Sequence, residues 1–220
     1  MSRWERFGLL VAGSLAVILP LLPVAKAPAV EEKAVNALTA YRASRIYTAE
    51  GPPIDDGVLV IQGSTIMAVG SGREVEIPKE AKVIDVKGVI IPGLVDTHSH
   101  IGLLSRPDVP SNSDGNEGSG AVQSGLRAMD AVNPNDPGIR MAVAGGVTTA
   151  NIMPGSGNVI GGQTIYVKLR GKTVEQMKVE ADGVLGGLKM ANGDNPKGFN
   201  FGRNKTPPGT RMKLSAMQRE

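Results

Sequence analysis

Short apolar runs, each closed by glycine or proline, fill residues 37–91 and are too short for the helices of a bundle. Five of them are rich in β-branched residues, at 43–48, 57–62, 65–69, 82–86 and 89–91. Runs of this length and composition predict β-strands. Gly63-Ser64 and Lys87-Gly88 have the two-residue spacing of hairpin turns. The sequence therefore predicts a small β-domain over residues 28–90.

The pattern changes after Pro92, where a helix is the clearest signal. Asp136 is a typical N-cap, Pro137 suits the first helical position, and Gly145-Gly146 predicts the end of the helix after Ala144. Segments 147–153 and 164–169 are predicted strands, and a short helix is expected over 173–181. Strands alternating with helices predict a parallel α/β arrangement over residues 91–220.

Two other segments of this half are informative. Residues 103–135 form a long connection rich in Ser, Asn, Asp, Gly and Pro, and a loop of that length is functional or mobile. Residues 210–220 begin like a helix and stop without a cap, so we expect the second domain to be truncated.

The N-terminus reads as an export signal. Arg3 and Arg6 precede an apolar stretch over 7–22, and Ala25-Lys26-Ala27 has the small-x-small pattern of a cleavage site. We predict a signal peptide over residues 1–27, cleaved after Ala27, which makes the protein periplasmic or secreted without a stable membrane span. The alternative is an uncleaved N-terminal anchor, although Pro20 disfavours a spanning helix.

Charge and cysteine content exclude several classes. Removing residues 1–27 takes away three basic residues and one acidic residue, so the net charge falls from +3 to +1. The remaining charges are scattered and aromatic residues are 3% of the chain, which argues against nucleic-acid binding. With no cysteine, the chain has no disulfides, thiolate metal sites or cysteine nucleophile.

The chemistry centres on the segment IIPGLVDTHSH, residues 90–100. Alternate residues of a strand share a face, so His98 and His100 are expected to point the same way and converge on one cation. Asp96 has the same parity and is expected to accept a hydrogen bond from a ligand imidazole. A bare His-x-His is also compatible with a solvated edge or a hydrogen-bonded pair, but its place at the end of an apolar strand favours a site.

This segment resembles the signature of the amidohydrolase superfamily, an apolar strand with Pro-Gly and Asp-x-His-x-His. The resemblance extends to AGGVTTA at 144–150, PGSGNVIGGQ at 154–163 and GLKMANGDNP at 187–196, which are similar to exported, imidazolonepropionase-like members. It implies a TIM-type (β/α)₈ barrel beside a composite β-sandwich, and hydrolysis of carbon–nitrogen bonds, non-peptide or small peptide amides, by metal-activated water. His98 and His100 would be ligands of one or two divalent metal ions, with zinc expected.

The chain departs from the family pattern in length and histidine content. Only 120 residues follow His100, whereas a full barrel takes roughly 250. In the family, further metal-ligand histidines lie on the fifth and sixth barrel strands. They have no counterpart here, since the chain holds two histidines in all. We therefore expect these 220 residues alone to be inactive. The expected protein partner is the missing half of the barrel or a second copy of the chain. No catalytic residue is assigned.

Three alternatives stay open at this stage. The chain is an amidohydrolase of small-molecule substrates, a non-catalytic exported remnant or binding module of the same fold, or a protein-binding β-domain without metal affinity. Two local features also have more than one interpretation. In some relatives a carbamylated lysine bridges two metal ions, and Lys189 is a candidate for that role. Contact of Lys189 with a backbone carbonyl or with solvent is the favoured interpretation. The glycine-rich loop 154–163 either offers N–H groups to an anion or only connects two elements.

Overall fold

The computed structural model describes residues 37–220, so the predicted signal peptide and its cleavage site lie outside the described residues. The described chain forms two units, one of residues 37–46 and 54–89 and the other of residues 47–53 and 90–220. Each is considered by itself. In the part of the chain that is described, no helix has the length and apolar character to cross a membrane.

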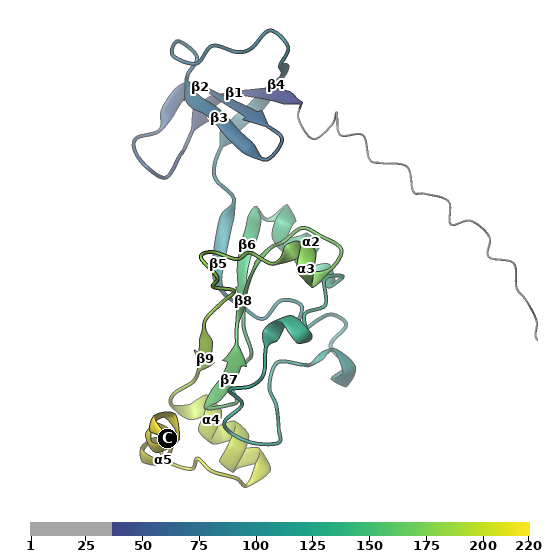
Figure 1. The fold of residues 1–220 in the computed structure, drawn as a ribbon, viewed down its shortest axis with the longest axis vertical. Helices are drawn as coiled ribbons and strands as arrows, with labels where there is room; N and C mark the ends of the chain where they lie inside the picture. Colours follow the sequence, from purple (N-terminus) through teal and green to yellow (C-terminus); the bar gives the residue numbers. More distant parts are fainter. Residues whose placement is uncertain (1–36) are drawn as a thin grey trace, which may run out of the picture. The chain divides into compact units, whose positions relative to one another are not determined.

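The first unit is a four-stranded sheet in the order β3-β2-β1-β4 (Figure 1). Its strands are β1 (Leu38–Ile46), β2 (Ile54–Gln62), β3 (Thr65–Ser71) and β4 (Lys82–Ile90). Ala40, Val58 and Val60 form its small core. The runs at 43–48, 57–62 and 65–69 lie in three separate strands as expected, but the runs at 82–86 and 89–91 belong to the single strand β4. The second sheet of a sandwich stays a prediction.

One predicted turn of this unit is confirmed and another is wrong. Gln62 pairs with Thr65 across the Gly63-Ser64 turn, and Gly63 has the positive φ of 58° that such a turn requires. Lys87-Gly88 is not a turn, because β4 runs through it as one strand beside β1. The Ser44 hydroxyl donates to the Gly88 carbonyl at 2.9 Å, which holds this part of β4 against its neighbour.

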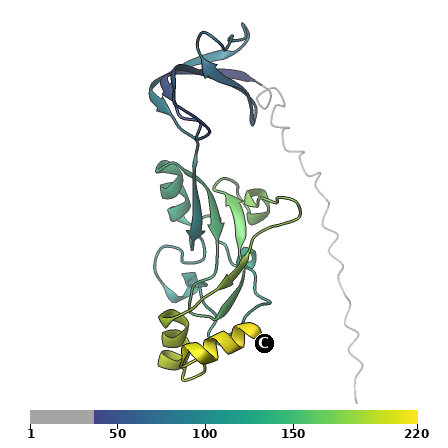
Figure 2. The ribbon, with the colours of Figure 1, turned by 90° about the vertical axis from the view of Figure 1, so that its left-hand side faces the viewer.

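The second unit is a mixed α/β structure built on a parallel strand pair (Figure 2). β5 (Leu94–Ser99) and β6 (Val147–Ile152) are parallel, and α2 (Pro137–Ala144) lies in the connection between them. β8 (Ile165–Lys168) adds to the other side of β6, giving the order β5-β6-β8. The remaining elements are η1 (Pro110–Asn112), η2 (Ala128–Asp130), β7 (Ile160–Gln163), α3 (Val174–Met177), β9 (Leu188–Met190), α4 (Asp194–Lys197), η3 (Gly198–Asn204) and α5 (Arg211–Arg219).

Two expectations for this unit are wrong in detail. β8 is antiparallel to β6, because the connection between them holds only the short strand β7 and no crossover helix. The helix expected over 173–181 is the single turn α3, since Lys178 leaves the helical conformation and forms a bridge with Val167 of β8.

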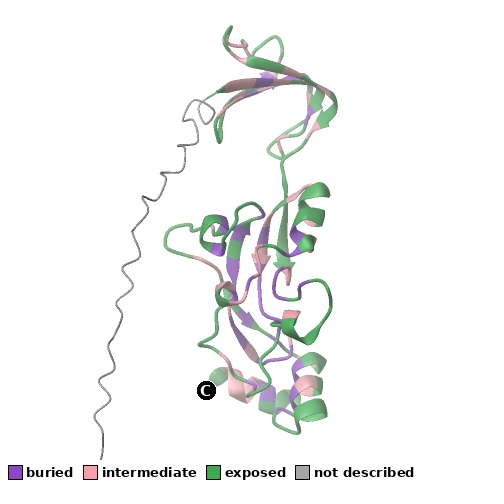
Figure 3. Cartoon of the chain, turned by 90° about the vertical axis from the view of Figure 1, so that its right-hand side faces the viewer, coloured by how far each residue is buried: buried purple, intermediate pink, exposed green. Residues whose placement is uncertain are grey.

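The core of the second unit lies on one face of the β5-β6-β8 sheet. Ala150 and Ile152 of β6 and Ile165 and Val167 of β8 are at most 1% exposed and pack with Ile139 of α2. β5 itself is largely exposed, as the green strand in Figure 3 shows. The opposite face of the sheet is therefore free of this core.

Asp136 joins the start of α2 to the loop that follows β5. One carboxylate oxygen accepts the N–H of Gly138 at 2.9 Å, and the other accepts the N–H of Gly102 at 2.9 Å. The side chain is 3% exposed, so both donors depend on it.

We expect Asp136→Ala to lower the free energy of unfolding by about 2 kcal/mol, because a helix cap and a buried acceptor are lost together. Urea denaturation of the 220-residue chain measures this. Asp130→Ala is the matched control, since its exposed ion pair with Arg127 is worth about 0–1 kcal/mol. Equal losses in both variants would contradict the structural role of Asp136.

Candidate metal centre

His98 and His100 come together at the carboxyl end of β5, as the alternation predicts. Their ring centroids are 5.4 Å apart and the rings are nearly perpendicular, at 88°. Two imidazoles on one tetrahedral zinc, with Zn–N distances of about 2.0–2.1 Å, have centroids about 5 Å apart. The spacing of the two rings therefore fits a shared divalent cation.

Both rings have the tautomer that metal binding requires. His100 Nδ1 lies 2.8 Å from the Met153 carbonyl oxygen, and a carbonyl only accepts, so Nδ1 carries the proton. His98 Nε2 lies 3.3 Å from Lys189 Nζ, and an ammonium group only donates, so this Nε2 is the acceptor. The backbone carbonyl of Met153 thus fixes the orientation of His100 with its Nε2 lone pair unprotonated, whereas the Nε2 lone pair of His98 faces Lys189 Nζ.

The role expected for Asp96 is wrong. Its carboxylate accepts the backbone N–H of His98 at 3.1 Å and binds no imidazole. The strand register explains this: Asp96 pairs with Ala150, but Ser99 pairs with Ile152, so β5 has one residue more than β6 over this stretch. Such a bulge breaks the alternation that would have placed Asp96 and His98 on one face.

Gly93 allows β5 to approach β6 closely before this bulge. A Cβ at residue 93 would overlap the side chain of Thr148. The Pro-Gly step of the motif therefore has a steric reason, because only glycine fits there.

Lys189 of β9 is the third member of the cluster, and the solvent or backbone contact favoured for it is wrong. The side chain is 8% exposed, and Nζ lies 3.3 Å from His98 Nε2 and 3.5 Å from the Met153 sulfur. Burial lowers the pKa of the Lys189 ammonium group below its usual 10.5. Lys189 is therefore directly beside the position that a cation on His98 would take.

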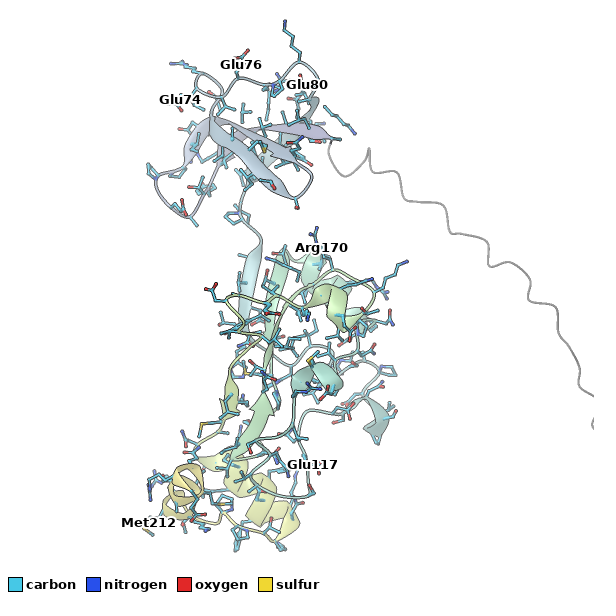
Figure 4. All side chains as sticks on the ribbon, viewed as in Figure 1. Glu74, Glu76, Glu80, Glu117, Arg170 and Met212 are labelled. Atoms are coloured by element: carbon cyan, nitrogen blue, oxygen red, sulfur yellow. The ribbon has the colours of Figure 1, made fainter. Side chains whose placement is uncertain are left out.

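The neighbouring loops are fastened to each other by asparagine side chains, the buried Asn158 and the exposed Asn116. The Asn158 side chain accepts the N–H of Glu117 and donates to the carbonyls of Glu117 and Gly120, at 2.7–3.1 Å. Glu117, labelled in Figure 4, lies on the long 103–135 connection. Gly157 N–H is held by the Asn116 carboxamide at 2.6 Å. The long connection is thus anchored to the glycine-rich loop.

Several N–H groups of loop 154–163 already have partners within the chain, which disfavours the anion-binding alternative. Besides Gly157, the N–H of Gly155 donates to the Gly115 carbonyl, and the N–H groups of Val159 and Ile160 both reach the Ala121 carbonyl. The loop therefore connects and braces, as its second interpretation had it.

One cavity adjoins Lys189 and another lies away from the histidines, in the first unit. One of about 240 Å³ is lined from both loops, and its wall at Gly161 adjoins Lys189, whose Cγ would be 3.4 Å from a Cβ at residue 161. The larger one, about 730 Å³, lies in the first unit around Arg42 and Asp85 and has no histidine. The smaller cavity is therefore the one beside the cluster.

Comparison with known proteins agrees with the motif. No family model matches the chain. The amidohydrolase tasK of Hapsidospora irregularis is 36% identical over 146 residues, covering 62% of this chain and 15% of that protein. The imidazolonepropionase of Chloroflexus aggregans is 39% identical over 79 residues, covering 29% and 18%.

A solved structure extends the similarity over most of the chain. The amidohydrolase from Thermotoga maritima MSB8 matches with a TM-score of 0.74 and 37% identity, covering 82% of this chain and 45% of that one. These relatives support the assignment of the chain to the amidohydrolase superfamily. The chain spans less than half the length of each of these three relatives. A mixed α/β fold similar to an amidohydrolase structure is thereby established.

Sequence reasoning found His98 and His100 but missed the groups that contact their rings. The Met153 carbonyl is a backbone group with no sequence signature. Lys189 lies 91 residues from His98, and only the pairing of β9 with β7 brings it near. The signal that was present is Lys189 itself, a charged residue between the apolar Leu188 and Met190.

The lowered pKa of Lys189 predicts a pH-dependent stability. Between the lowered folded pKa and the unfolded value, the unfolded chain binds more protons, so the free energy of unfolding rises with pH up to about 10.4. We expect Lys189→Met to be more stable than the parent at pH 7 and to lack this increment. Urea unfolding of both proteins from pH 7 to 10 measures the difference; parallel pH curves would rule the effect out.

Proposed function

We propose that this chain carries the first metal-binding strand of an exported, metal-dependent hydrolase that acts on carbon–nitrogen bonds of small molecules. The observation that supports it most is the geometry of His98 and His100, with nearly perpendicular rings 5.4 Å apart at the end of β5. The relatives named amidohydrolase and imidazolonepropionase support the same reaction class.

The proposed architecture is a (β/α)₈ barrel with a composite β-sandwich. In this proposal β5 and β6 are the first two barrel strands, and the face opposite the helix-packed core is the barrel interior. Leu94 and Val95 of β5 are 51% and 60% exposed, as expected of strands that further units of the barrel would cover. Those units, or a second copy of the chain, are the proposed partner.

A divalent metal, zinc in this proposal, would be held by the Nε2 atoms of His98 and His100. When bound, it acidifies a water molecule and polarises the carbonyl of the scissile bond. The residues of this chain supply position: the Met153 carbonyl holds the His100 ring, and Asp96 holds the backbone at His98. Since this chain covers less than half of each of these relatives, we propose that these 220 residues bind metal without turnover.

Lys189 is proposed as a further ligand in carboxylated form, the role of the bridging lysine in some relatives. Its uncharged amine adds to CO₂, forming the N–C bond and releasing a proton. The product carries carboxylate oxygens where the ammonium group now faces His98 Nε2 at 3.3 Å. Repulsion between the ammonium group and a cation is thereby replaced by attraction.

We expect the double variant His98→Ala/His100→Ala to lose stoichiometric Zn²⁺ binding, because both imidazole ligands are removed. Isothermal titration calorimetry of the 220-residue chain measures it, and Thr97→Ala is the control for the same strand. Hydrolysis of small amides and cyclic imides is then tested with any coding sequence downstream of Glu220 restored. A folded parent chain without Zn²⁺ affinity would overturn the proposal and leave the remnant or binding-module alternative.

The Lys189 role predicts that bicarbonate tightens Zn²⁺ binding by the parent chain and not by Lys189→Met. Titrations in CO₂-free buffer and with added bicarbonate give the two dissociation constants for each protein. Identical constants for the parent under both conditions would refute carboxylation.

A further inference from the structure

Asn151 has the one side-chain oxygen or nitrogen atom of the described residues that is buried without a hydrogen-bond partner. The atom is Oδ1, an acceptor. Buried acceptors are nearly always paired, so an orphan of this kind calls for a donor or a cation that binds there. The position of Asn151 relative to the histidines indicates which.

Asn151 lies on the same side of β6 as the metal-binding cluster. Its neighbours Ala150 and Ile152 point into the core, so the Asn151 side chain points to the opposite face. Met153, two residues on, shares that face, and its sulfur contacts Lys189, which in turn contacts His98.

The strand register places Asn151 level with His98. Asp96 pairs with Ala150 and Ser99 with Ile152, so the bulged pair Thr97 and His98 stands opposite Asn151 alone. Adjacent strands are about 4.8 Å apart. The orphaned oxygen is therefore on the strand next to His98, at the same height.

The cluster lacks the donors that usually complete a metal site. Across residues 37–220, no three His, Asp, Glu or Cys side chains gather to hold a metal. Two imidazoles fall short of the three or four protein ligands of a zinc site. A carboxamide oxygen is a donor for divalent cations, and here it is one with no competing partner inside the fold.

We propose that Asn151 Oδ1 is an oxygen ligand of the divalent cation held by His98 and His100. This rests on the proposed function of the two histidines. It also gives a reason for the bulge in β5, which turns His98 towards the face that Asn151 occupies. In the metal-free chain the same oxygen contributes nothing to stability, because it has no partner there.

The test compares the 220-residue chain with Asn151→Leu, which keeps the side-chain size but has no donor, and with Asn151→Asp, which adds a charge to the same oxygen. Zn²⁺ affinity is measured by calorimetry, and Co²⁺ is added as a spectroscopic probe of the donor set. Asn151→Leu is expected to weaken Zn²⁺ binding at least about tenfold, since the loss of an outer partner of a ligand already costs that much. It should also alter the visible Co²⁺ spectrum. Asn151→Asp is expected to bind Zn²⁺ more tightly than the parent.

Thermal unfolding without metal separates this role from a structural one. Asn151→Leu should be at least as stable as the parent when metal-free and should gain less from added Zn²⁺. A metal-free loss of stability, an unchanged Zn²⁺ affinity in Asn151→Leu, or no gain in Asn151→Asp would each overturn the assignment. Where Asn151→Leu does not fold, the Asn151→Asp result decides alone.

His98→Ala in the same series keeps the two proposals apart. If His98→Ala abolishes Zn²⁺ binding while the Asn151 variants bind like the parent, the metal centre stands and only the Asn151 ligand is lost. If the parent itself binds no Zn²⁺, the proposed function fails and the Asn151 assignment fails with it.

Discussion

The parallel pairing of β5 with β6 determines where His98, His100 and Asn151 lie. α2 crosses between the two strands and packs with the apolar side of β6, so that face is closed by the core. The polar groups of the sheet are left on the other face. The extra residue in β5 then sets the direction of His98, and the end of β6 supplies the Met153 carbonyl that orients His100.

Around this pair, backbone and carboxamide groups perform the tasks that carboxylates perform in many metal sites. Met153 orients an imidazole through its carbonyl, and Asn158 ties the 103–135 connection to the loop after β6. A long polar connection is thereby ordered without a disulfide, in a chain that has no cysteine. The anchored loops also line the cavity of about 240 Å³ whose wall at Gly161 adjoins Lys189.

In the second unit the core covers one face of the sheet, whereas β5 is largely exposed to solvent. The core is built from small and medium aliphatic side chains, as the 3% aromatic content requires. The exposed Leu94, Val95 and Tyr166 lie on β5 and β8, outside that core. The Thermotoga maritima relative, of which this chain covers 45%, has further chain with which to cover such strands. This is why the proposal treats metal binding and turnover as separable properties.

The sequence by itself determined the strands of the first unit, the capped helix α2 and the convergence of His98 and His100, because these depend on turn residues, caps and alternation along a few neighbouring positions. Only the tertiary structure decided that β8 is antiparallel, that Asp96 serves the backbone, and that Lys189 and Asn151 border the histidines. Those outcomes depend on a strand bulge and on pairings between segments up to 91 residues apart. Register between distant strands follows from packing of the whole unit, and no local pattern encodes it.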